Sequence, residues 1–134
     1  MKYIEIFDRK ASFPRLLSVD VIECIFDTED GVIISTGGKY GVHPSQYHGN
    51  ILSRIEDVSE RRFVTFPLKF PDWGCVSIPL DRIAQICPHG DKETFVNVPC
   101  KGFRGRFRGW FVAEPYSFVL MKILAFMGKE MEAE

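Results

Sequence analysis

Residues 16 to 25 read Leu-Leu-Ser-Val-Asp-Val-Ile-Glu-Cys-Ile, and residues 76 to 86 read Val-Ser-Ile-Pro-Leu-Asp-Arg-Ile-Ala-Gln-Ile. A β-branched run, a further valine-containing strand and an amphipathic stretch follow each of them. In the resulting alignment the matched pairs are Asp20 with Asp81, Ile22 with Ile83, Ile25 with Ile86, and Val42 with Val112. We therefore interpret residues 16–55 and 76–123 as two copies of one unit.

The first copy shows how the unit is built. Alternation over residues 19–24 predicts a strand, and the Asp30-Gly31 turn leads into the run 32–34, which is typical of a buried strand. The Gly37-Gly38 pair predicts a second tight turn before a third strand at 40–42. Apolar residues at helical spacing then predict a helix that begins near Pro44 and continues to Val58. The unit is β-β-β-α.

The segments outside the two copies complete the predicted fold. Residues 3–7 and 62–70 read as leading strands, and Pro67 favours a sheet edge because proline cannot donate to the ladder. Residues 71–74 read as a turn, and a second helix is expected from Glu114-Pro115 to near Gly128. We predict an α+β fold in which two small, mostly antiparallel sheets and two helices form one pseudo-symmetric domain. Its first repeat covers residues 1–60 and its second 61–128, with an extended hairpin at 99–109 and a frayed tail at 129–134.

The composition limits the class of protein. A chain of 134 residues that is 46% hydrophobic and 26% charged is typical of one ordinary globular domain. The formal net charge of −1 excludes a broadly basic nucleic-acid binder. Charges near the N-terminus argue against a signal peptide, and the longest apolar run is far shorter than the ~20 residues of a membrane span. We predict a cytoplasmic protein with no membrane partner, whose four cysteines are free thiols because no Cys-x-x-Cys pair occurs.

The first copy also carries a family resemblance. Its residues Val21-Ile22-Glu23-Cys24-Ile25, Thr28-Glu29-Asp30-Gly31-Val32-Ile33, Thr36-Gly37-Gly38-Lys39-Tyr40-Gly41-Val42 and Ser45 resemble the small FlbD-type flagellar proteins. That family has no assigned catalytic residues. The resemblance covers about forty residues and implies a small interaction protein rather than an enzyme.

The main difference between the copies is an insertion. The short turn at 36–39 is replaced by residues 99–109, and from Thr94 to Ala113 no acidic residue occurs, so the local charge is +4. If the segment is a strand, its arginines and Trp110 share one face. The predicted partner-binding residues are Lys101, Arg104, Arg106, Phe107, Arg108 and Trp110.

Arginine and aromatic residues together indicate an anionic partner. Guanidinium groups bind phosphates or carboxylates bidentately, and aromatic rings offer stacking platforms for bases. The first hypothesis is therefore a non-enzymatic regulatory or inhibitory binding protein that engages nucleic acid, a nucleotide or an acidic protein. The alternative for this segment is a solvated strand face whose arginines pair with nearby carboxylates.

A second hypothesis uses the apolar segments instead. The C-terminal helix is apolar on nearly every side, which fits either a core helix between the sheets or a helix covered by a partner. The aromatic segment 63–73 could act with it in a protein–protein interaction module or phage-type inhibitor, and we also consider a homo-oligomer. The residues of this interface are Phe63, Phe66, Phe70, Trp73, Phe118, Met121 and Phe126.

Catalysis and metal binding have weak sequence support. Cys87-Pro88-His89 with Cys75 and Cys100 lacks the paired spacing of structural zinc sites, and His43 and His48 adjoin no candidate nucleophile. Asp20 and Asp81 fit repeated turn residues better than a catalytic carboxylate pair. We predict no catalytic residue, metal or cofactor; a small enzyme with a pocket between the repeats is the third hypothesis.

Overall fold

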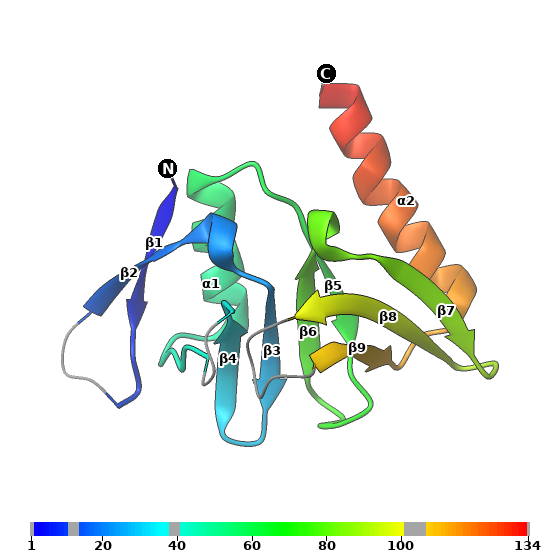
Figure 1. The fold of residues 1–134 in the computed structure, drawn as a ribbon, viewed down its shortest axis with the longest axis horizontal. Coiled ribbons are helices and arrows are strands. Elements are labelled where there is room, and N and C mark those ends of the chain that lie inside the picture. Colours follow the sequence, from blue (N-terminus) through cyan, green and yellow to red (C-terminus); the bar gives the residue numbers. More distant parts are fainter. Residues whose placement is uncertain (1, 11–13, 38–40, 101–106, 134) are drawn as a thin grey trace.

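Figure 1 shows the computed structural model of the chain, which describes residues 2–10, 14–37, 41–100 and 107–133. The elements of the first half are β1 (Tyr3–Phe7), β2 (Pro14–Ser18), the 3₁₀ turn η1 (Val19–Val21), β3 (Cys24–Thr28), β4 (Gly31–Ser35) and α1 (His48–Val58). Those of the second half are β5 (Phe63–Pro67), β6 (Cys75–Pro79), η2 (Leu80–Arg82), β7 (Gln85–His89), β8 (Glu93–Cys100), β9 (Phe107–Val112) and α2 (Tyr116–Ala133).

The strands form three antiparallel sheets, which confirms the predicted α+β class with one sheet more than expected. β1 and β2 form a two-stranded sheet, and β7, β8 and β9 form a three-stranded sheet. Between them lies a four-stranded sheet in the order β4-β3-β6-β5 (Figure 1). β5 is an edge strand, as Pro67 predicted. This central sheet takes two strands from each half of the chain.

β3 and β4 separate two hydrophobic cores. Ile25 and Ile34 face a cluster that also contains Ile6 of β1 and Ile51 of α1. Phe26, the next residue along β3, belongs instead to a cluster built mainly from the second half. Successive side chains of a strand point to opposite faces, so a strand covered on both faces reads as a continuous apolar run. This confirms the interpretation of residues 32–34 as a buried strand.

The two halves repeat the same backbone hydrogen bonds. The matching bonds are Val19 N to Lys2 O and Leu80 N to Arg62 O, Ser45 N to Phe7 O and Ala113 N to Pro67 O, and Glu23 N to Ser35 O and Ala84 N to Asn97 O. Isolated bridges join Asp8 to Pro44 in the first half and Leu68 to Val112 in the second. The halves therefore share an arrangement of strands, while their origin in a duplication stays a prediction.

This register corrects one aligned pair. Val42 bridges to Ile34, and Trp110 occupies the same place opposite Val96. Trp110 thus matches Val42, whereas the alignment had matched Val42 with Val112. The apolar pattern of the sequence cannot distinguish this alignment of the two copies from one shifted by two residues, because every second strand residue faces the same way.

Three element boundaries differ from the prediction. Residues 19–21 form a 3₁₀ turn rather than a strand, because the chain passes there from the two-stranded sheet to the central sheet. α1 begins at His48 because Pro44 is held in its bridge to Asp8. α2 continues to Ala133, whereas the prediction ended this helix near Gly128. Residues 129–133 are mostly good helix formers.

Arg61 joins the two 3₁₀ turns. Its guanidinium donates to the carbonyl oxygens of Val19 in η1 at 2.6 Å and of Ile22, which directly follows η1, at 2.8 Å. The same group binds both carboxylate oxygens of Asp81 in η2, at 3.1 and 2.9 Å. Asp81 therefore has a structural role, and Asp20 is an exposed residue of η1. This agrees with the interpretation of the aspartates as turn residues.

The helices lie on separate cores. α1 contacts β1 and β3, while α2 contacts β5, β7 and β8. In Figure 1 the C-terminal part of α2 extends beyond the sheets. α2 thus packs on strands of two sheets, but Phe118 and Met121 on its other side are exposed, so it is not the fully buried core helix of the first alternative.

Candidate functional site

The arginine-rich insertion lies mostly outside the described residues. This applies to Lys101, Arg104 and Arg106 entirely, and to the side chains of Phe107 and Arg108, whose backbone belongs to β9. Trp110 is described, and its ring packs on Phe26 of the core with centroids 4.7 Å apart. Trp110 is therefore half-buried, and its part in partner binding stays a prediction. The neighbouring Phe111 is 50% exposed.

A close backbone approach explains one glycine of the insertion. A side chain at Gly109 would meet the carbonyl oxygen of Val96 and the ring of Phe95. Gly109 pairs with Asn97 of β8. The approaching group is thus the adjacent strand, so Gly109 needs no ligand to account for it.

The aromatic segment 63–73, which covers β5 and the turn before β6, contains both buried and exposed side chains. Phe66 is fully buried in the core, so its assignment to an interface is wrong. Phe63 is half-buried. Phe70 is 78% exposed and Trp73 is 69% exposed, in a turn where Gly74 N donates to Pro71 O. The exposed aromatic side chains of segment 63–73 are thus Phe70 and Trp73, both in the turn.

α2 exposes a long apolar surface. Its inner side carries Val119, which is buried, and Phe126, which packs on the core and is half-buried. The large exposed apolar side chains of its outer side are Phe118 (57%), Met121 (68%), Leu124 (53%) and Met127 (45%). We call these four residues the outer face of α2. Lys122, the only charged residue of 116–128, binds Glu114 and the carbonyl oxygen of Thr65.

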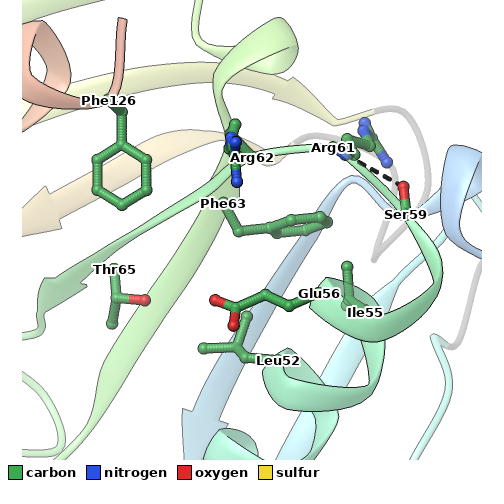
Figure 2. Close-up of a pocket in the computed structure, with 9 residues that line it drawn as sticks. All are labelled: Leu52, Ile55, Glu56, Ser59, Arg61, Arg62, Phe63, Thr65 and Phe126. Atoms are coloured by element: carbon green, nitrogen blue, oxygen red, sulfur yellow. Dashed lines mark hydrogen bonds between the residues drawn. The ribbon is translucent and has the colours of Figure 1, made fainter. Parts of the chain in front are cut away.

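Two hollows lined by described residues are considered as small-molecule sites. Figure 2 shows the first, of about 180 Å³, where Leu52 and Glu56 of α1 face Phe63 of β5 and Phe126 of α2. Arg61 and Arg62 lie at its upper side (Figure 2). It lies between the two halves, where the enzyme hypothesis expects a pocket, but it is smaller than the ~300–1,000 Å³ of typical ligand pockets.

The second hollow, of about 310 Å³, lies beside the exposed turn. Its lining residues are Leu68, Lys69, Phe70, His89, Glu93, Trp110 and Phe111. Lys69 and Glu93 form an ion pair of 2.9 Å, which lowers the pKa of Glu93 below its ordinary value. The charges of Lys69 and Glu93 at this hollow therefore neutralise each other.

A polar cluster lies where α1 meets the central sheet. His48, the first residue of α1, places Nδ1 3.0 Å from Oδ1 of Asp27 in β3 and 3.6 Å from Sγ of Cys75 in β6. Cys75 Sγ donates to Oδ2 of Asp27 at 3.3 Å, and the Cys75 amide donates to the same oxygen at 2.8 Å. His48 and Cys75 are candidates in the sequence only as separate residues, and Asp27 is not among the predicted site residues. No local spacing could reveal the cluster, because 48 residues separate its ends.

The cluster continues into the sheet through two hydroxyl groups. His48 Nε2 lies 2.7 Å from Oγ of Ser77, and that oxygen lies 2.7 Å from Oγ1 of Thr65 in β5. Ser77, His48 and Asp27 thus have the connectivity of a hydrolase triad. Ser77 is fully buried in β6, so no acyl group can reach it.

Cysteine-based catalysis does not fit the cluster either. Burial, together with the charge and hydrogen bond of Asp27, raises the pKa of the Cys75 thiol to about 12. The thiolate is the reactive form, so at neutral pH Cys75 is a poor nucleophile. Cys75 and Cys87 are free thiols, as the sequence predicted.

No family model, curated protein or solved structure matches this chain. The resemblance of residues 16–55 to FlbD-type flagellar proteins therefore stays a prediction. None of the helices in the described part of the chain combines the length and apolar character needed to cross a membrane.

Proposed function

We propose that the protein is a non-enzymatic interaction module that self-associates through the outer face of α2. The observation that carries this proposal is the exposure of four large apolar side chains along one helix, without a charged residue among them. Contiguous apolar surface of this kind on a folded domain marks a contact with another protein more often than a free surface.

The spacing of these residues favours a second copy of the chain as the occupant. In an antiparallel pair of α2 helices related by a two-fold axis near residues 122–123, Met121 lies at the level of Leu124 of the other copy. Phe118 and Met127, nine residues or two and a half turns apart, flank this contact at opposite edges of the outer face. A two-fold contact requires such self-complementary surfaces.

The available area agrees with a weak dimer. Four side chains of ~200 Å², each about half exposed, offer roughly 400–450 Å² per copy. Two copies together approach the ~1,000 Å² that a specific interface needs. Small residues on the same side of the helix, Ser117, Ala125 and Gly128, allow the helix backbones to come close.

Sedimentation equilibrium over a wide range of protein concentration tests the proposal. We expect a reversible dimer that high salt does not weaken, because apolar association does not depend on ion pairs. Met121→Glu with Leu124→Glu should give a monomer with an unchanged thermal transition. Leu16→Glu is the matched control, since Leu16 is 71% exposed on β2, and this variant should remain dimeric.

Two results would overturn self-association: a monomer at every concentration, or a dimer that persists in the double glutamate variant. A monomer at every concentration would also mean that no second copy of the chain covers the outer face of α2.

A second candidate function is binding of an anionic partner through residues 101–110. The observation that favours it is the local charge of +4 without any acidic residue between Thr94 and Ala113. Fluorescence anisotropy with a labelled single-stranded oligonucleotide tests it, because phosphate binding weakens steeply as salt rises. Joint replacement of Arg104, Arg106 and Arg108 by alanine should remove this binding while the protein stays folded. Binding that resists high salt, or that survives the triple replacement, would contradict this function.

A further inference from the structure

Three atoms of different ligand chemistry converge at the N-terminus of α1. They are a carboxylate oxygen of Asp27, Nδ1 of His48 and Sγ of Cys75, and all lie within 4.8 Å of one another. Oxygen, imidazole nitrogen and thiolate are the donors that zinc accepts in proteins.

The spacing of the donors matches a tetrahedral ion. With Zn–S of ~2.3 Å and Zn–N or Zn–O of ~2.0 Å, tetrahedral geometry places sulfur about 3.5 Å from nitrogen or oxygen, with nitrogen and oxygen about 3.3 Å apart. Cys75 Sγ lies 3.6 Å from His48 Nδ1, close to this value. The Asp27 carboxylate approaches His48 Nδ1 with Oδ1 at 3.0 Å and Cys75 Sγ with Oδ2 at 3.3 Å, so it must turn to ligate the ion through one oxygen. Small side-chain shifts are enough to admit the ion.

The surroundings of His48 include an outer partner for the ligating tautomer. Its Nε2 lies 2.7 Å from Ser77 Oγ, which lies 2.7 Å from Thr65 Oγ1. When Nε2–H donates to Ser77, the lone pair of Nδ1 points toward Asp27 and Cys75. Such an outer partner orients the imidazole of most metal-binding histidines.

The backbone holds all three donors on regular structure. Asp27 lies in β3, Cys75 in β6 and His48 at the first position of α1. Cys75 is only partly buried, so water can reach the cluster and supply a fourth ligand. Three protein ligands with one open position are a common zinc arrangement.

We propose that Asp27, His48 and Cys75 form a binding site for one zinc ion. Binding displaces the thiol proton of Cys75 to solvent, so that the sulfur ligates as thiolate. The ion would link α1 to β3 and β6 directly. The site does not depend on self-association through α2.

Titration of the full chain with Co²⁺, a spectroscopic substitute for Zn²⁺, tests the proposal. We expect one Co²⁺ per chain, a thiolate-to-cobalt charge-transfer band in the near ultraviolet, and loss of both signals when Zn²⁺ is added. Zn²⁺ should also raise the thermal transition, and a chelator should reverse this effect.

Variants assign the ligands. Cys75→Ser should remove the charge-transfer band, and Ser77→Ala should lower the affinity by about 10-fold or more through the orientation of His48. Cys87→Ser and Cys100→Ser are the matched controls and should keep the band.

Absence of a charge-transfer band in the folded wild-type chain would overturn the site, and this measurement needs no variant. A band that persists in Cys75→Ser would also overturn it, because another cysteine would then be the ligand.

Discussion

Replacement of Arg61 by alanine should be among the most destabilising changes at a polar side chain. The guanidinium donates two hydrogen bonds to carbonyl oxygens at the two ends of η1 and two to Asp81 in η2, and the Arg61 side chain is 10% exposed. It also lies over the ring of Phe63, 5.4 Å from the centroid. Loss of Arg61 thus removes the side chain that links the two 3₁₀ turns, and it leaves two carbonyl groups without their hydrogen-bond donor.

The loss of stability in Arg61→Ala depends on how much each hydrogen bond of Arg61 contributes. Hydrogen bonds from charged donors contribute roughly 1.5–3 kcal/mol each, and water recovers part of this after truncation, so the two carbonyl bonds together are worth about 3 kcal/mol. The Asp81 side chain is 63% exposed, and an exposed ion pair contributes only about 0.5 kcal/mol. Arg61→Ala should therefore cost about 3 kcal/mol, or about 10 °C in Tm for a chain of this size. Asp81→Ala should cost about 0.5 kcal/mol.

Equilibrium unfolding in urea measures both variants, with the slope against urea checked for constancy. Arg62→Ala, which removes the same charge from the neighbouring residue, is the control and should stay close to the wild type. Added salt should abolish the small effect of Asp81→Ala and leave that of Arg61→Ala nearly unchanged. Equal costs for Arg61→Ala and Asp81→Ala would refute the argument, because the ion pair would then carry the stability.

Three further predictions concern single positions. Phe66→Ala should cost about 3–5 kcal/mol because the ring is fully buried, whereas Phe70→Ala should change the free energy of unfolding by less than about 0.5 kcal/mol; urea unfolding compares them. Gly109→Ala should destabilise by about 1–3 kcal/mol through its contact with the Val96 carbonyl, while Gly49→Ala, in open space on α1, should stabilise by about 0.5–1 kcal/mol; Tm shifts of opposite sign check this pair. Lys69 lowers the pKa of Glu93 below 4.5, so this pair stabilises the fold above that pH and loses its effect as pH falls through the lowered pKa. In Lys69→Met an NMR titration should find the pKa of Glu93 raised, and an unchanged pKa would contradict the pairing.

The parts of the fold that the sequence predicted are those with local causes. The buried run at 32–34, the edge position of Pro67 and the turn before Gly74 each follow from residue type and spacing within a few positions. The prediction of a strand at residues 19–21 is wrong because side chains over residues 19–24 alternate in the same way in a straight strand and in a chain that bends. The bend arises from the distant contact between Val19 and Lys2.

The candidate sites were less predictable for the same reason. Phe66 is buried and Phe70 is exposed, although both belong to one aromatic segment. Trp110 follows the arginines in the sequence, yet it packs on Phe26 from the other half of the chain. The cluster of Asp27, His48 and Cys75 exists only because β3, β6 and α1 meet. No spacing within the chain indicates such a meeting.

The central sheet also has a consequence for the order of folding. Every pairing in the three sheets joins strands that are neighbours along the chain except that of β3 with β6, where Ile25 and Phe26 meet Ser77 and Val76. Local hairpins close quickly, whereas contacts between distant residues must first overcome the entropy of a long loop. We expect the hairpins to form early and the β3–β6 contact to form late. Substitutions at Phe26 and Val76 should then mainly accelerate unfolding, and the short joint between the halves would control how long the native state lasts.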